Sequence, residues 1–345
     1  MTSMAKPSID PVRWQPPGVR ALSLKPQPLP RLSIVALPGH GPEDVVADAV
    51  GNIWAGVADG RIFRISPDDA EGPAVTHVAT TEHPPLGLHI ARDGRVLICS
   101  RDKLLALDPA SGKIEPVVTK VDGPPLIFCS NVTESTDGTI YFSESTARFP
   151  FEQFMAAILE GRPTGRVFRR DPDGTVTTIA TGLAFTNGVT ITADGSALII
   201  AETVGRRVSR YALTGPAAGT LTPIVEEIPG MPDNISTGAD GRIWITLASP
   251  RNALAEWLLP RSPAIRKVLW RLPDALLPST DTDPWVIAVN PDTGDVVANI
   301  TGKSRDLRTV TGVVESGGRL WMGCIGSSAV GHISLADIAS SSSGR

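Results

Sequence analysis

A short phrase recurs six times along the 345-residue chain: a turn, a glycine, and then four or five mostly apolar residues. In four copies an aspartate directly precedes the glycine, and Asp-Gly between apolar runs is typical of a tight hairpin, because glycine accepts a positive φ. A second apolar segment usually follows and ends in another turn. The six phrases begin at Gly51, Gly94, Gly138, Gly195, Gly241 and Gly318.

Units of about 40 to 50 residues with four short strands are typical of propeller blades, so the repeat predicts an all-β, six-bladed β-propeller. Residues 20–37 are left over before the first unit, and little chain follows the last phrase. We therefore expect an N-terminal strand to complete the sixth blade, which removes an open sheet edge. The predicted organisation is an N-terminal extension (1–19), the propeller (20–337) and a disordered tail (338–345). Six copies in one register disfavour a β-sandwich or two unrelated β domains.

Two stretches, residues 147–163 and 252–277, carry apolar residues at helical spacing, which predicts short helical insertions in blades three and five. One interpretation is a lid, a substrate wall or a membrane-facing patch. The other is a helix that only caps the propeller surface. The second stretch is basic, which is most often a solvated face.

The composition indicates which kinds of partner and which compartment to expect. The net charge of -4 argues against nucleic acid or an anionic membrane as the main partner, so a small molecule is expected. The three cysteines are far apart and form no CxxC motif, which disfavours a disulfide framework or zinc ribbon and indicates a reducing compartment. An export signal and an apolar run of about 18 residues are not found, so we predict a cytoplasmic protein without a membrane span.

Oxygen-bearing residues recur at the place where each blade's first strand approaches the central tunnel. Counting back eight from each repeat glycine finds Glu43, Ser130, Asn187 and Asp233, and Asn131 adjoins the third position. Two carboxylates and two carboxamides would form an all-oxygen cage, which suits calcium or another divalent cation. Since neither His nor Cys joins the set, zinc and copper are disfavoured. The alternative is that each residue only fixes a turn. The predicted metal ligands are Glu43, Asn131, Asn187 and Asp233.

The motifs around these residues resemble a known superfamily. Gly-Pro-Glu43, Asn131 before an Asp-Gly-Thr-Ile-Tyr-Phe strand, Phe-x-Asn187-Gly-Val and Pro-Asp233-Asn234-Ile are similar to the senescence-marker/gluconolactonase and strictosidine-synthase-like superfamily, and closest to its strictosidine-synthase-like branch. The resemblance covers about residues 30 to 336. It implies a six-bladed propeller with a catalytic calcium held at the same four positions, with Asn234 as an extra ligand in the paraoxonase-like arrangement.

The chain departs from that superfamily at two places. Strictosidine synthases carry a catalytic glutamate where this chain has Thr311, which argues against their condensation chemistry. Paraoxonases carry a histidine dyad near the second blade's first strand, but His89 is shifted from the matching place. We interpret His89 as a core or surface histidine.

These features predict a calcium-dependent hydrolase that opens lactones or esters in the central tunnel. The cation would act as a Lewis acid, and Asp233 would orient or deprotonate the attacking water, or attack directly. Asp44 and His89 are weaker alternatives for the general base. Two other functions remain open: a strictosidine-type condensing enzyme, and a non-catalytic, metal-stabilised propeller that binds a small molecule.

Overall fold

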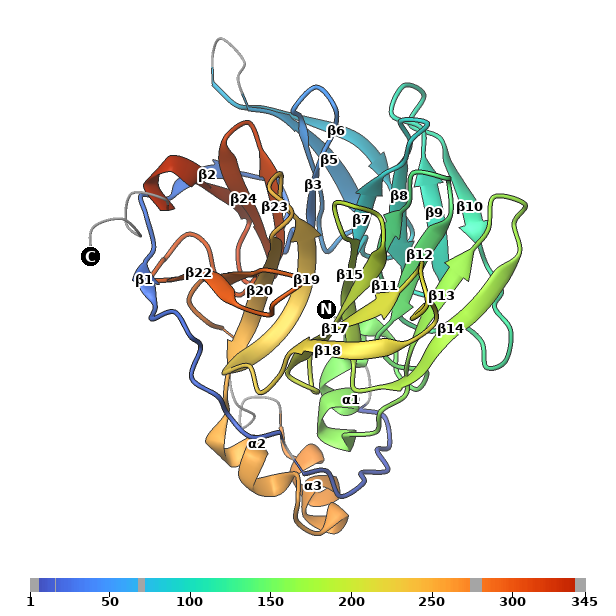
Figure 1. The fold of residues 1–345 in the computed structure, drawn as a ribbon, viewed down its shortest axis with the longest axis vertical. Helices are drawn as coiled ribbons and strands as arrows, with labels where there is room; N and C mark the ends of the chain where they lie inside the picture. The colour runs from blue at the N-terminus through green and yellow to red at the C-terminus, as the bar shows by residue number, and fades with distance from the viewer. Residues whose placement is uncertain (1–5, 16, 68–71, 274–280, 339–345) are drawn as a thin grey trace.

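The computed structural model describes residues 6–15, 17–67, 72–273 and 281–338. These residues form six β-sheets arranged around a central axis (Figure 1), which confirms the predicted six-bladed propeller. The strands of the first three blades are β3 (Val45–Ala47), β4 (Ile53–Gly56), β5 (Arg61–Ser66) and β6 (Ala74–Thr80); β7 (Leu88–Ile90), β8 (Val96–Ser100), β9 (Lys103–Leu107) and β10 (Ile114–Val118); and β11 (Cys129–Glu134), β12 (Ile140–Glu144), β13 (Gly165–Arg170) and β14 (Val176–Leu183).

The other three blades follow in chain order. Their strands are β15 (Thr186–Ile191), β16 (Ala197–Glu202), β17 (Arg207–Ala212) and β18 (Leu221–Val225); β19 (Gly230–Thr237), β20 (Ile243–Pro250), β21 (Trp285–Val289) and β22 (Val296–Thr301); and β23 (Val310–Ser316), β24 (Arg319–Cys324) and β25 (Ala329–Ser334). The first strand of each blade lies innermost, beside the tunnel.

The ring closes through the N-terminus. Strand β2 (Ser33–Ala36) pairs antiparallel with β25, so it is the outer strand of blade six. Strand β1 (Gln27–Pro28) adds a short parallel edge to β22 of blade five, which the sequence does not predict. At the other end, Ile338 is only 5% exposed and packs in the core of blade six, and the rest of the predicted tail, 339–345, lies outside the described residues.

The repeat phrase explains the core. Its glycines sit in turns at positive φ, for example Gly138 at 87° and Gly241 at 85°, where a side chain would be strained. Each blade packs between its two neighbours, so both faces of the strand that follows the turn are buried. Its sequence is therefore a continuous apolar run. Trp54, Trp244 and Trp321 occupy this strand and are 2%, 0% and 1% exposed. The three cysteines are buried free thiols.

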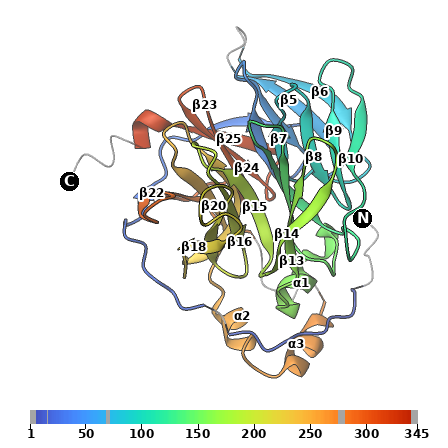
Figure 2. The same ribbon diagram turned by 45° about the vertical axis from the view of Figure 1, so that its right-hand side comes forward.

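Helices extend from one end of the propeller. A 3-10 turn (Phe151–Gln153) and α1 (Phe154–Glu160) lie between β12 and β13, and α2 (Ala253–Leu258) and α3 (Pro263–Trp270) lie between β20 and β21. The N-terminal segment 6–15 runs across these helices (Figure 2), where Val12 N donates to Glu160 O at 3.0 Å. In the described part of the chain, no helix is long and apolar enough to span a bilayer.

Candidate functional site

The inner strands begin irregularly. In blades three to six, the pairing of the first with the second strand shifts register near the start of the inner strand. Such bulges bend a strand and re-aim its side chains. The register shifts span Cys129 to Val132, Thr186 to Val189, Pro232 to Ile235 and Val310 to Gly312. Three of these intervals contain the predicted ligands Asn131, Asn187 and Asp233.

Two residues at the start of each inner strand, here called the inner pair, show an alternation around the ring. In blades one, three and five the second member is polar, and in blades two, four and six it is glycine. The pairs are Glu43 and Asp44, Leu86 and Gly87, Ser130 and Asn131, Asn187 and Gly188, Asp233 and Asn234, and Thr311 and Gly312.

The glycines are required by close backbone approach. A Cβ at Gly87 would lie 2.4 Å from Asn131 Cα, and one at Gly188 would lie 2.5 Å from Ile235 N. Because real Cβ atoms essentially never come so near to backbone, these positions exclude any side chain. Gly312 faces Asp44 in the same way, with 2.7 Å to its Cα. The glycines of the even blades therefore leave room for the polar residues of the odd blades.

Asp44, Asn131 and Asn234 form a hydrogen-bonded group at the tunnel axis, here called the axial ring. Asn131 Nδ2 donates to Asp44 Oδ2 at 3.3 Å and to Asn234 Oδ1 at 3.1 Å. Asp44 Oδ2 also accepts from Leu88 N at 2.9 Å, and Asn131 Oδ1 accepts from Val189 N at 3.0 Å. The ring thus joins the inner strands of five successive blades.

Glu43 is hydrogen-bonded to this ring, whereas Asn187 and Asp233 are hydrogen-bonded to each other. Glu43 Oε1 accepts from Asn234 Nδ2 at 3.1 Å, whereas Glu43 Oε2 is buried without a hydrogen-bond partner in the described part of the chain. Asn187 Nδ2 donates to Asp233 Oδ1, and Asn187 Oδ1 accepts from Ser130 Oγ at 3.2 Å. Glu43 and Asp233 are each only 8% exposed.

The electrostatics of the site favour protonated carboxyls in the absence of a cation. Burial, together with the neighbouring charges of Asp44 and Asp233, raises the pKa of Glu43 well above its usual range. Burial also raises the pKa of Asp44 and of Asp233 to about 7. Within the described residues, no ion pair joins any of these carboxylates to a basic side chain.

The donor chemistry fits a hard cation. The side chains of Glu43, Asn187 and Asp233 all carry oxygen atoms, and the partnerless Oε2 of Glu43 is a free acceptor. Among the described residues, no cluster of three or more His, Cys, Asp or Glu side chains is arranged to hold a metal. A cation here would therefore depend on the amide oxygens as well as on the two carboxylates.

The structure brings all four predicted ligands into one hydrogen-bonded network. Sequence reasoning ranked Asp44 and Asn234 lower, yet both are central members of the axial ring. The signal that could have found them is the glycine at the second position of each alternate inner pair. That spacing requires neighbouring strands to touch, and at the second position it leaves only the odd blades to supply side chains.

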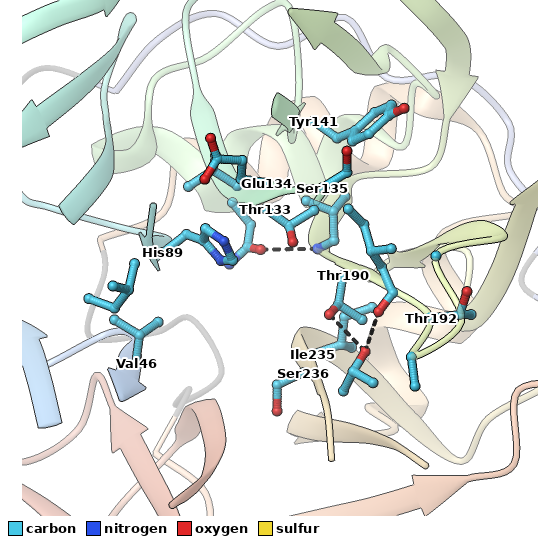
Figure 3. A pocket seen from close by; sticks show the side chains of 18 of the residues that line it. Val46, His89, Thr133, Glu134, Ser135, Tyr141, Thr190, Thr192, Ile235 and Ser236 are labelled. Atoms are coloured by element: carbon cyan, nitrogen blue, oxygen red, sulfur yellow. Dashed lines mark hydrogen bonds between the residues drawn. The ribbon is translucent and has the colours of Figure 1, made fainter. Parts of the chain in front are cut away.

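A cavity of about 710 Å³ occupies the tunnel on one side of the axial ring. Asp44 and Asn131 line it, whereas Glu43, Asn187 and Asp233 do not, so the axial ring separates this cavity from those three residues. Figure 3 shows His89, Thr133 and Thr190 arranged around the cavity.

Comparison with known proteins identifies the family. The model described as strictosidine synthase matches residues 131–216, and the model described as strictosidine synthase-like, N-terminal, matches residues 27–65. Protein STRICTOSIDINE SYNTHASE-LIKE 10 of Arabidopsis thaliana is 32% identical over 323 residues, which cover 86% of each chain. The chain belongs to the strictosidine synthase-like family. A more distant relative, the adipocyte plasma membrane-associated protein of Salmo salar, is 27% identical over 67% of this chain and 60% of its own.

Solved structures support the fold of this strictosidine synthase-like chain. A gluconolactonase from Xanthomonas campestris superposes with a TM-score of 0.64 at 16% identity, over 96% of this chain and 99% of its own. Regucalcin from Agrobacterium tumefaciens, described as a calcium-binding protein, superposes with a TM-score of 0.61 at 15% identity, over 89% of this chain and 94% of its own. At such identities the likeness shows the propeller fold alone.

Thr311 and His89 stand at or near the two positions where the sequence departs from strictosidine synthases and paraoxonases. Thr311 is 2% exposed, and its Oγ1 donates to Glu43 O at 2.6 Å, so it supports the backbone of the site and supplies no carboxylate. His89 lies on β7, and burial lowers its pKa to about 4, so its imidazole is neutral near pH 7. The cavity lining contains no second histidine among the described residues.

Proposed function

We propose that this protein is a divalent-cation-dependent hydrolase that opens a lactone or an ester at the Glu43, Asn187 and Asp233 group. One observation carries the proposal. Two carboxylates are buried together on the propeller axis without a basic partner, and one of their oxygens has no hydrogen bond. Such a cluster is costly unless a cation balances it. Calcium is the expected ion because the available donors are all oxygens.

The ligands in this proposal are Glu43, Asn131, Asn187 and Asp233. Bound calcium would supply Lewis acidity for the carbonyl and its developing oxyanion. Asn187 Nδ2 donates to Asp233 Oδ1 and to Thr203 Oγ1, the latter at 3.2 Å, so its amide group has a defined orientation. Asn131 Oδ1 accepts Val189 N at 3.0 Å and keeps a second lone pair.

Asp233 is the proposed base. Its carboxylate is held by Asn187, and its buried position excludes bulk water, so it can orient a water molecule and take its proton. The proton then passes to the leaving alkoxide, which conserves charge over the reaction. Glu43 remains ionised and balances the cation. In this scheme Asp44 is a positioning residue, since its oxygens are committed to Val45 N, Leu88 N and Asn131.

Lactones are the first substrates to test, because one of the proteins that share this fold is described as a gluconolactonase. The condensing alternative suggested by the relatives' names has weaker support. The position that carries the catalytic glutamate in strictosidine synthases is Thr311, whose hydroxyl is occupied by Glu43 O. The other member of the inner pair of blade six is Gly312, so this pair carries no acidic side chain.

The test is a hydrolysis panel of sugar lactones, acyl lactones and aryl esters, assayed with calcium, with EDTA and after calcium is restored. We expect turnover that EDTA removes and calcium restores. Turnover that persists at full rate in EDTA would exclude the cation mechanism. Stoichiometric calcium binding without turnover of any member would favour the non-catalytic propeller, and product from an amine and an aldehyde would favour the condensing enzyme.

A further inference from the structure

Exposed apolar side chains gather on helices α2 and α3. Leu254 is 54% exposed, Trp257 is 50%, Ile265 is 38% and Val268 is 64%. Four other large apolar side chains are exposed among the described residues, and they are scattered along the chain at Val19, Ile34, Val50 and Val297. A concentration of exposed apolar groups on one element is typical of an interaction surface.

Helix α3 exposes Ile265 and Val268 on its outward side. Arg266 and Trp270, one turn apart, are buried on the side that faces the N-terminal segment, where Trp270 Nε1 donates to Pro7 O at 2.7 Å. Ile265 and Val268 are three residues apart and therefore share the opposite side of the helix. Ile265 and Val268 are therefore not part of the side of α3 that packs on the protein, because Arg266 and Trp270 occupy that side.

The helices are held firmly in this orientation. The buried guanidinium of Arg266 donates to Leu159 O at 2.7 Å and to Glu160 O at 3.2 Å, which ties α3 to the end of α1. Arg206 and Glu256 form a 2.5 Å ion pair that ties α2 to the propeller. The exposed side chains of α2 and α3 are therefore presented by a fixed layer.

The same segment is strongly basic. Residues 251–271 contain five basic side chains and one carboxylate, whereas the whole chain has a net charge of -4. Arg266 is buried, Arg251 pairs with Glu256 and Lys267 pairs with Asp10, so the charge offered outward comes mainly from Arg261 and Arg271. Arg261 stacks on Trp257, with 3.7 Å from Cζ to the ring centroid, and the exposed Arg271 follows the end of α3. The negative net charge of the chain argues against an anionic membrane as main partner, but this segment has a positive charge.

We propose that the outward face of α2 and α3 docks on the surface of an anionic lipid bilayer. Leu254, Trp257 and Val268 would enter the headgroup region while the adjacent arginines meet lipid phosphates, as in other interfacial helices. The pairing of Gly230 with Pro250 places the start of this insertion beside the start of β19, the strand that carries Asp233. Docking would therefore hold this end of the tunnel against the membrane.

The experiment is flotation of the full chain with vesicles of phosphatidylcholine, with or without phosphatidylserine, at low and high ionic strength. We expect binding that requires phosphatidylserine and weakens with salt. Leu254→Ser/Val268→Ser should lower the bound fraction by about tenfold or more, because the apolar groups supply the insertion. The matched control Val50→Ser/Val297→Ser removes two apolar groups that are 84% and 42% exposed elsewhere and should bind as the wild type does.

A second pair of variants tests the charge. Arg261→Gln/Arg271→Gln should weaken binding about fivefold per charge. Arg92→Gln/Lys113→Gln changes the net charge equally at turns at the far end of blade two and should have little effect. Failure of the wild type to float with phosphatidylserine, equal binding to neutral vesicles, or equal loss in the control pairs would overturn the proposal. So would a monomeric mass in Leu254→Ser/Val268→Ser beside a dimeric wild type, since a second copy would then cover this face.

Discussion

Asn131 donates a hydrogen bond of 3.3 Å to Asp44 across 87 residues of sequence, and so joins the inner strands of blades three and one. The same amide group reaches Asn234 of blade five. Three alternate blades therefore meet at the axis, where the intervening blades carry only glycine. Because Glu43 and Asp233 adjoin this ring, their carboxylates are held close together without a basic partner.

Removing one carboxylate charge should abolish the proposed cation site without unfolding the protein. We expect Glu43→Gln to lower calcium affinity by at least about 100-fold, because a charged ligand becomes neutral. In EDTA near pH 8 the variant should be more stable than the wild type, because folding no longer has to bury Glu43 against its raised pKa. Calorimetric titration and urea unfolding measure the two effects. Asp194→Asn, at an exposed turn, is the control, and undiminished calcium affinity in Glu43→Gln would contradict the site.

The stabilisation by calcium should grow with pH. Asp44 and Asp233 ionise near pH 7 in the folded, metal-free protein but near 3.8 when unfolded. Unfolding then releases protons between about pH 4 and pH 7, so the metal-free protein loses stability as the pH rises through this window. Calcium requires the ionised carboxylates and binds better as the pH rises. Urea unfolding with calcium and with EDTA should therefore differ little at pH 5 and most at pH 8.

A calcium effect of constant size from pH 5 to pH 8 would be inconsistent with carboxyls of raised pKa. The His89→Gln variant is a useful control. Because burial lowers the pKa of His89 to about 4, the imidazole is already neutral across this range. The unfolded imidazole still takes up a proton below about pH 6.5, so the variant should change the stability with calcium and with EDTA equally. The difference between the two conditions should keep its pH dependence.

Gly188 should tolerate no side chain. The Cβ of Gly188→Ala would lie 2.5 Å from Ile235 N and 2.7 Å from Asn234 Cα, and backbone atoms cannot move aside cheaply. We expect a loss of about 1–3 kcal/mol in the free energy of unfolding, and weaker calcium binding because β19 is displaced. Gly182→Ala has open space but a φ of 73°, so it should lose stability through strain alone and keep its calcium affinity. Equal affinities in the two variants would contradict the close packing.

A buried ion pair supports blade three. Arg166 Nε lies 2.5 Å from Glu144 Oε2, and these side chains are 7% and 0% exposed. Arg166→Met would leave Glu144 buried without its partner, at a cost of about 3–5 kcal/mol. Arg95→Met breaks a pair whose side chains are 43% and 52% exposed and should cost less than about 1 kcal/mol. Chemical denaturation measures both, and similar losses would show that burial does not set the value of the pair.

Much of the propeller could be predicted from local pattern. The turn glycines at Gly138 and Gly241 have the positive φ that Asp-Gly indicates, and each is followed by a strand buried on both faces. Both properties depend on residues within one blade. Three of the four predicted ligands were singled out because they stand eight residues before the repeat glycines, and Asn131 because it adjoins the equivalent position.

The axial ring could not be predicted in this way. Asp44 is ranked low from the sequence, and its hydrogen bond with Asn131 requires the inner strands of blades one and three to meet at the axis of a closed ring. The N-terminal segment over α1 and α3 is similar, since Val12 meets Glu160 only after both have docked.

The sequence by itself determined the blades and their number, because strand period and turn chemistry are local properties. The tertiary structure decided which residues of the inner strands touch, since that depends on the closure of the ring and on close backbone approach at Gly87, Gly188 and Gly312. It also raised the pKa of Glu43, because burial, which no local pattern encodes, penalises the charged carboxylate.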